Sequence, residues 1–206
     1  MVWCERSVTP WHVTTRRDER LRTLYLTTAR ALTLARLGSI PLFLWLLVHT
    51  HDNVSLLSKG SLLLLYVCIA LSDFLDGRLA RLAGAPSYVW GQVDAAADIA
   101  FTSMSLAVAA WLGWVGVWVP IGVAVLGGRF VLRNLRPQPR LGARLVEDRA
   151  GKAAGVIYYL LVGAIVSVMV VDGAGGRWWI ARAGDAVFLY TLFLLLRRMP
   201  DRPNTT

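Results

Sequence analysis

Cysteine and histidine are scarce in this sequence, and their placement excludes several kinds of site. The two cysteines, Cys4 and Cys68, are too far apart to suggest a zinc site, and Cys68 lies in an apolar run where a small hydrophobic role is expected. The three histidines do not accompany the acidic residues, so we assign them no function. A glycine-rich phosphate loop, a nucleophile elbow and a CxxC pair are also missing. Enzymes that depend on those motifs are therefore not indicated.

Charged residues are also few, and long apolar runs separate them. The chain is 56% hydrophobic, contains nine tryptophans and has a mean hydropathy of +0.52, a composition typical of membrane proteins. Each apolar run approaches the ~20 residues that a helix needs to cross a bilayer. We therefore predict an all-α membrane protein with six transmembrane helices, at residues 29–48, 59–81, 89–112, 115–135, 152–171 and 178–196.

The segment before the first apolar run is polar and basic. Residues 14–29 mix leucines and a tyrosine with arginines, which suits an amphipathic interfacial helix on an anionic membrane surface; a solvated basic tail is the alternative. A secretory signal peptide is not expected, because the segment has no short apolar core with a small-residue cleavage site. We therefore expect an N-terminal cytoplasmic or interfacial segment (1–28), a six-span domain (29–198) and a cytoplasmic tail (199–206).

Basic residues outnumber acidic ones by 22 to 13, and their distribution predicts the orientation in the membrane. They gather before the first span, between the second and third, between the fourth and fifth, and after the sixth. Because cytoplasmic loops are enriched in lysine and arginine, both termini are expected to be cytoplasmic. We predict an integral protein of the cell membrane whose active site faces the cytoplasm. Topology thereby explains the basic charge, and no nucleic-acid partner is predicted.

Four aspartates lie between apolar runs in two spaced pairs. Asp73 and Asp76 are three residues apart, and Asp94 and Asp98 are four apart, so each pair shares one helix face. With ~1.5 Å rise per residue, both pairs lie ~14–20 Å from the turn between their helices, at matched depth. Carboxylates within a membrane are costly and mark functional sites. Converging carboxylates offer hard oxygen ligands, which predicts a site for Mg²⁺ or Mn²⁺.

This stretch resembles the signature of the CDP-alcohol phosphatidyltransferases, D-x-x-D-G-x-x-A-R-x8-G-x3-D-x3-D. Seven positions match in identity and spacing: Asp73, Asp76, Gly77, Ala80, Arg81, Asp94 and Asp98. The sequence departs where the second glycine is usual, because Trp90 stands there and the glycine follows as Gly91. Seven fixed positions over so short a stretch are far more specific than a lone glycine motif.

The first span resembles a second pattern of the same family, N-x-L-T-x-x-R followed by proline. Leu32, Thr33, Arg36 and Pro41 match it, whereas Arg30 stands where asparagine is usual. An arginine within an apolar run needs a partner or must reach the membrane surface. We therefore expect Arg36 to point into the active-site cavity.

The resemblance implies a phosphatidyltransferase that uses CDP-diacylglycerol and releases CMP. The implied ligands of Mg²⁺ or Mn²⁺ are Asp73, Asp76, Asp94 and Asp98. The implied contacts to the CDP group are Asp76, Gly77, Ala80 and Arg81. Asp98 is the candidate general base, which would take a proton from the acceptor hydroxyl. The diacylglycerol part would stay among the membrane lipids, and the resemblance also implies a homodimer.

Basic residues near the fourth and fifth spans are candidates for binding an acceptor phosphate. Arg129 and Arg133 share a helix face, and Lys152 opens the fifth span. The GRF and AGK triplets here weakly resemble phosphatidylglycerophosphate synthases, although ordinary positive-inside bias is the alternative. Together with Arg36, these residues favour a phosphorylated acceptor. Glycerol 3-phosphate, giving phosphatidylglycerophosphate, is our first choice, with inositol phosphate, inositol and serine as alternatives.

Three other functions remain open at the level of sequence. A membrane prenyltransferase also binds pyrophosphate through aspartates and Mg²⁺, but the glycine, alanine and arginine of the signature have no counterpart there. A cation transporter would also place carboxylates in the membrane, although broken helices or repeats would be expected. A non-catalytic membrane partner that has kept the motif is the third. Release of CMP on adding an acceptor separates the enzyme from all three.

Overall fold

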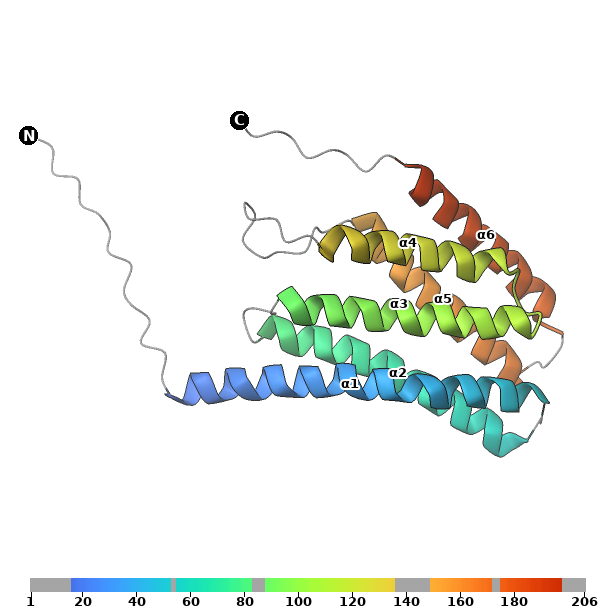
Figure 1. Ribbon diagram of the computed structural model, residues 1–206. Coiled ribbons are helices and arrows are strands. Elements are labelled where there is room, and N and C mark those ends of the chain that lie inside the picture. Colours follow the sequence, from blue (N-terminus) through green and yellow to red (C-terminus); the bar gives the residue numbers. More distant parts are fainter. Residues whose placement is uncertain (1–15, 53–54, 83–87, 136–148, 172–174, 198–206) are drawn as a thin grey trace, which may run out of the picture.

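The computed structural model describes residues 16–52, 55–82, 88–135, 149–171 and 175–197. This part of the chain forms six α-helices, and successive helices run in opposite directions (Figure 1). They are α1 (Arg16–Asp52), α2 (Leu56–Leu82), α3 (Tyr88–Trp111), α4 (Trp118–Leu135), α5 (Arg149–Val171) and α6 (Arg177–Leu196). The six helices match the six apolar runs, so the predicted all-α architecture is confirmed.

The lengths and compositions of the helices identify an integral membrane protein. In the described part of the chain, five helical segments are long and apolar enough to cross a bilayer: Thr23–Asp52, Leu56–Leu75, Trp90–Trp111, Ala150–Val171 and Arg177–Leu196. α4 is not among them, and it carries Arg129 and Arg133 in its second half. Large apolar side chains on all six helices are exposed, as lipid-facing surfaces require.

The amphipathic N-terminal helix that we expected is joined directly to the first span. α1 runs without interruption for 37 residues, so residues 16–29 form its first turns. The sequence explains this continuity, because neither glycine nor proline occurs between Arg16 and Leu37. At ~1.5 Å per residue the helix is ~55 Å long, well beyond the ~30 Å of the hydrocarbon core. Its basic first turns therefore extend beyond the membrane interior.

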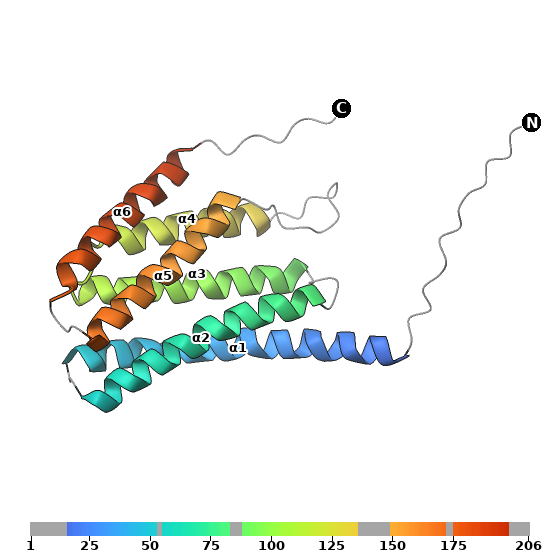
Figure 2. The ribbon, with the colours of Figure 1, turned by 180° about the vertical axis from the view of Figure 1, so that it is seen from behind.

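Two helices, α1 and α5, flank the helices that carry the aspartates. Both α1 and α5 pack against α2 and α3, and α4 and α6 complete the bundle (Figures 1 and 2). Small residues allow α4 and α6 to approach closely. A Cβ atom at Gly122 on α4 would lie 3.2 Å from the Phe188 ring, and one at Gly184 on α6 would lie 3.6 Å from Val119 of α4. This packing fixes the frame on which the site is built.

Different helix termini meet at the two ends of the bundle. The end of α2, the start of α3, the end of α4 and the start of α5 lie together at one end (Figure 1). At the other end, the Arg177 guanidinium donates to the carbonyls of Leu112 and Gly113, each at 3.0 Å, and lies 5.3 Å from the Trp114 ring centroid. Gly113 has a φ of 76°, which favours glycine. Arg177 thus ties the turn after α3 to the start of α6.

Candidate functional site

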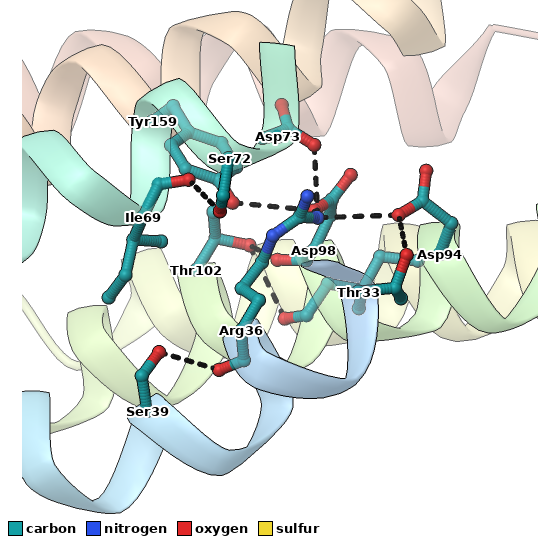
Figure 3. Close-up of polar contacts among 11 residues, drawn as sticks. Thr33, Arg36, Ser39, Ile69, Ser72, Asp73, Asp94, Asp98, Thr102 and Tyr159 are labelled. Atoms are coloured by element: carbon teal, nitrogen blue, oxygen red, sulfur yellow. Dashed lines mark hydrogen bonds and ion pairs between the residues drawn. The ribbon is translucent and has the colours of Figure 1, made fainter. Parts of the chain in front are cut away.

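One buried arginine from α1 contacts three aspartates from α2 and α3 (Figure 3). Its Nη1 atom lies 3.0 Å from Asp73 Oδ1 and 3.4 Å from Asp94 Oδ1, and it also bonds to Asp98 Oδ1. The Arg36 side chain is 0% exposed, whereas each of the three carboxylates is about one-third exposed. The carboxylates therefore remain partly accessible from outside the cluster.

Helix geometry explains why these residues converge. Asp94 and Asp98 are one turn apart on α3, and Asp73 projects from the preceding helix α2, which runs in the opposite direction (Figure 1). One oxygen from each of the three carboxylates lies within 4.8 Å of the others. For these three aspartates, the structure therefore contains the convergence that we predicted from their spacing.

The donor set suits a divalent cation. Like charges this close repel one another, and one guanidinium leaves an excess of negative charge when all three carboxylates are ionised. The three carboxylate oxygens already surround one cation, the guanidinium of Arg36, so their arrangement favours positive charge. Mg²⁺ and Mn²⁺ prefer carboxylate oxygens of this kind. Asp73, Asp94 and Asp98 could therefore hold such an ion.

Two hydroxyl groups hold the carboxylates of α3 in place. Thr33, one turn before Arg36 on α1, donates to Asp94 Oδ1 at 3.3 Å. Tyr159 on α5 donates its phenolic hydrogen to Asp98 Oδ1 at 3.3 Å. Hydrogen bonds to a carboxylate orient it and lower its conformational freedom. Asp94 is thus held by two residues of α1, whereas Asp98 is held by Arg36 of α1 and by Tyr159 of α5.

Tyr159 is a site residue that our sequence analysis missed. Its signal was available, because a tyrosine within a long apolar run needs a hydrogen-bond partner for its hydroxyl. Its neighbour Tyr158 carries the same signal but bonds instead to Thr191 on α6, at 2.8 Å. Only the packing of α5 decides which of the two reaches the aspartates.

Aromatic rings close the site on the side away from the start of α3. The Phe101 ring lies 5.1 Å from Phe43 and 5.3 Å from Tyr159, measured between centroids. The Tyr66 hydroxyl donates to the Tyr159 carbonyl at 2.8 Å and so joins α2 to α5. Phe43 and Phe101 are fully buried. This apolar layer therefore separates the aspartates from the half of the bundle in which α1 ends and α2 begins.

The structure does not describe the side chains of the four residues that we predicted to contact the CDP group. Their backbone belongs to α2, and Asp76 follows Asp73 by one helical turn. The side chains of Asp76, Gly77, Ala80 and Arg81 lie outside the described residues. Their roles as metal ligand and nucleotide contacts stay predictions.

The residues predicted to bind an acceptor phosphate occupy two different places. Arg36 lies with the aspartates, as the family pattern in the first span led us to expect. Arg129 donates from α4 to the carbonyl of Leu195 on α6, at 3.0 Å, so it contributes to helix packing. Arg133 and Lys152 are exposed, near the end of α4 and the start of α5 respectively. Because the end of α4 and the start of α5 lie with the end of α2 and the start of α3 (Figure 1), these last two residues lie at the end of the bundle nearer the aspartates.

Comparison with known proteins agrees with the signature and the geometry. Residues 26–196 match the CDP-alcohol phosphatidyltransferase family. The chain is also similar to a CMP-forming cardiolipin synthase of Streptomyces coelicolor, with 29% identity over 162 residues, which cover 76% of this chain and 69% of that protein. No solved structure matches the chain significantly. The match spans all six helices and includes the aspartate cluster, and the chain therefore belongs to the CDP-alcohol phosphatidyltransferase family.

Proposed function

We propose that this enzyme transfers the phosphatidyl group of CDP-diacylglycerol to a hydroxyl of a glycerol that also carries a phosphate group. The observation that carries the chemistry is the convergence of Asp73, Asp94 and Asp98 on Arg36, at positions that match the family patterns. The acceptor oxygen forms a bond to the phosphorus of the phosphatidyl group. The bond from that phosphorus to the CMP oxygen breaks, and CMP leaves with the bonding electrons.

The family is generally dependent on divalent metal, and the aspartates fit that requirement. The residues that would hold Mg²⁺ or Mn²⁺ are Asp73, Asp94 and Asp98, with Asp76 added by the signature. A bound ion would neutralise charge on the pyrophosphate and on the departing oxygen. Which ion serves, and how many are held, is decided by measuring activity against each metal.

Asp98 is our candidate for the general base. Its carboxylate lies in the cluster, is about one-third exposed, and is oriented by Arg36 and Tyr159. A base must lie within hydrogen-bond reach of the proton that it removes. In this assignment Asp98 accepts the proton of the attacking hydroxyl, while Arg36 and Tyr159 hold its carboxylate in place.

Glycerol 3-phosphate is the first candidate for the acceptor. Arg133 and Lys152 supply exposed positive charge at the end of the bundle where α4 ends and α5 begins. Such side chains suit the doubly charged phosphate of a water-soluble acceptor. The product would be phosphatidylglycerophosphate.

Phosphatidylglycerol is the second candidate, and the similarity to a cardiolipin synthase favours it. Cardiolipin carries two phosphatidyl groups on one glycerol, so a CMP-forming synthesis joins CDP-diacylglycerol to phosphatidylglycerol. This acceptor would arrive within the membrane, and its phosphate carries a single charge. The two candidates share a glycerol hydroxyl and a nearby phosphate but differ in charge and in location.

Product analysis distinguishes the acceptors. Purified protein in detergent is given CDP-diacylglycerol, Mg²⁺ or Mn²⁺, and one of glycerol 3-phosphate, phosphatidylglycerol, inositol 1-phosphate, inositol or serine. Mass spectrometry then identifies the lipid formed. Phosphatidylglycerophosphate or cardiolipin supports the proposal and selects between its two forms. A product formed only with inositol 1-phosphate, inositol or serine contradicts a glycerol acceptor.

We place the active site on the cytoplasmic face of the cell membrane. The distribution of basic residues supports this orientation through the positive-inside rule. In a variant that lacks Cys4 and Cys68, a membrane-impermeant maleimide should label Trp179→Cys in intact cells and should not label Arg78→Cys. The reverse pattern contradicts the orientation. The homodimer implied by the family resemblance also stays a prediction, which mass measurement of the purified protein checks.

A further inference from the structure

The two positions at which this chain departs from the family patterns lie in contact with each other. Arg30 stands in place of the usual asparagine on α1, and Trp90 stands in place of the usual glycine on α3. In the structure the guanidinium carbon of Arg30 lies 4.9 Å from the centroid of the Trp90 ring. That distance is typical of a cation–π contact. The two departures are therefore one physical feature.

The contact lies beside the aspartate site. Arg30 is one turn before Thr33 on α1, and Trp90 is one turn before Asp94 on α3. Thr33 and Asp94 are themselves hydrogen-bonded at 3.3 Å. The Arg30–Trp90 pair is thus the next layer of the interface between α1 and α3, toward the start of α3. Each carboxylate of the site is about one-third exposed, so the pair lies next to groups that are partly accessible.

When a guanidinium stacks on an aromatic ring, its N–H groups lie in the plane of the guanidinium, alongside the ring face. These donors point away from the ring and can bind a phosphate with two parallel hydrogen bonds. Stacking also restricts the arginine, so less freedom is lost when a ligand binds. Arg30 and Trp90 are both only partly buried, which leaves part of the pair accessible.

We infer that Arg30, positioned by Trp90, binds a phosphate group of a substrate beside the aspartate site. This inference rests on the proposed function for the identity of the substrates. The phosphate belongs either to the pyrophosphate of CDP-diacylglycerol or to the acceptor. Arg30 is a binding residue in this assignment, and Trp90 is a positioning residue that acts through it.

Steady-state kinetics on a small set of variants tests the inference. Arg30→Gln removes the charge, Trp90→Leu removes the aromatic face, and Trp90→Phe keeps an aromatic face. Arg78→Gln is the matched control, because Arg78 is an exposed arginine on α2 at the same end of the bundle. For each variant, kcat, the KM of CDP-diacylglycerol, the KM of the acceptor and the thermal unfolding temperature are measured.

The expected result is a selective rise in KM. Arg30→Gln should raise the KM of one substrate by about tenfold or more, as expected for a lost hydrogen bond to a charged group. Trp90→Leu should raise the same KM by a smaller factor, and Trp90→Phe should stay close to wild type. The double variant Arg30→Gln with Trp90→Leu should be no worse than Arg30→Gln alone, because the two residues act as a unit. The substrate whose KM rises identifies the source of the phosphate.

Two results would overturn the inference. The first is an Arg30→Gln enzyme with both KM values equal to those of Arg78→Gln and a lowered unfolding temperature, which would make the pair a helix contact only. The second is a Trp90→Leu effect on a different substrate from that of Arg30→Gln. Equilibrium binding of CDP-diacylglycerol and of the acceptor, measured without turnover, keeps the test separate from the proposed function. If wild type binds its ligand but releases no CMP, the proposed function fails. The inference about Arg30 is then still tested by whether Arg30→Gln loses that binding.

Discussion

Arg36 Nη1 lies 3.0 Å from Asp73 Oδ1, and this ion pair joins α1 to α2 in the membrane-spanning part of the chain. Asp94 and Asp98 on α3 bond to the same nitrogen. A charged arginine and three carboxylates would each be costly here alone. Together they partly neutralise one another, and each depends on the others for its stability.

Removal of the Arg36 charge should therefore affect both folding and catalysis. We expect Arg36→Gln to lower the free energy of unfolding by about 3 kcal/mol, the low end for a broken buried pair, because the carboxylates are partly exposed. The activity of Arg36→Gln should fall below 1% of wild type. The activity and stability of Arg36→Lys should lie between those of Arg36→Gln and wild type. Thermal unfolding in detergent and CMP release provide the measurements. An Arg36→Gln enzyme with wild-type stability would contradict the role that we assign to this ion cluster.

Divalent metal should stabilise the folded protein through the aspartates. Saturating Mg²⁺ or Mn²⁺ at about 100 times its dissociation constant should add roughly 2.7 kcal/mol, provided that the unfolded chain does not bind the ion. The unfolding temperature of wild type should rise with metal and fall with EDTA, and Asp94→Asn should weaken this response. Asp185→Asn is the matched control, since Asp185 is bonded to Trp118 on the far side of the bundle. Equal metal responses in Asp94→Asn and Asp185→Asn would exclude the cluster as the metal site.

The Tyr159 hydroxyl should matter for turnover more than for binding. Tyr159→Phe keeps the ring that packs against Phe101 but removes the hydrogen bond to Asp98. The loss of one hydrogen bond to a carboxylate should lower kcat by about tenfold and leave the KM of CDP-diacylglycerol within about twofold.

Tyr158→Phe is the control for this measurement. It removes a hydroxyl of the same kind that bonds to Thr191 instead, away from the aspartates. We expect a loss of about 1 kcal/mol of stability and an unchanged kcat. Equal kcat values for Tyr158→Phe and Tyr159→Phe would remove Tyr159 from the site.

The far end of the bundle should contribute stability without contributing to catalysis. Arg177→Gln loses two hydrogen bonds to the turn after α3 and the contact with the Trp114 ring. The free energy of unfolding should fall by about 1–3 kcal/mol. Both KM values and the metal response should match wild type. A raised KM in a folded Arg177→Gln protein would show that this end communicates with the site.

Local helix geometry explains what could be predicted from the sequence. The four-residue spacing between Asp94 and Asp98 places both side chains on one face of any helix. The short connection between α2 and α3 brings Asp73 to the same depth. Apolar runs of about 20 residues likewise predict the spans. These features depend on residues that are near one another in the chain, so no tertiary information is needed.

Features that depend on packing between distant helices could not be predicted. Tyr158 and Tyr159 are neighbours, their directions differ by ~100° on a helix, and both are compatible with the apolar pattern of α5. The approach of Tyr159 to Asp98 joins residues 61 positions apart in the chain. The contact of Arg30 with Trp90 has the same origin, since it depends on how α1 crosses α3.

The most direct test of the active-site assignment is CMP release from CDP-diacylglycerol by wild type and by Asp98→Asn. Both proteins are purified in detergent and supplied with metal and with each candidate acceptor. We predict that wild type releases CMP with a glycerol acceptor and that Asp98→Asn retains less than about 1% of that rate, because an amide cannot take the proton. Asp98→Asn should keep the wild-type fold, since an amide preserves the shape of the carboxylate. A folded Asp98→Asn protein that releases CMP as fast as wild type would contradict the assignment of this cluster as the catalytic centre.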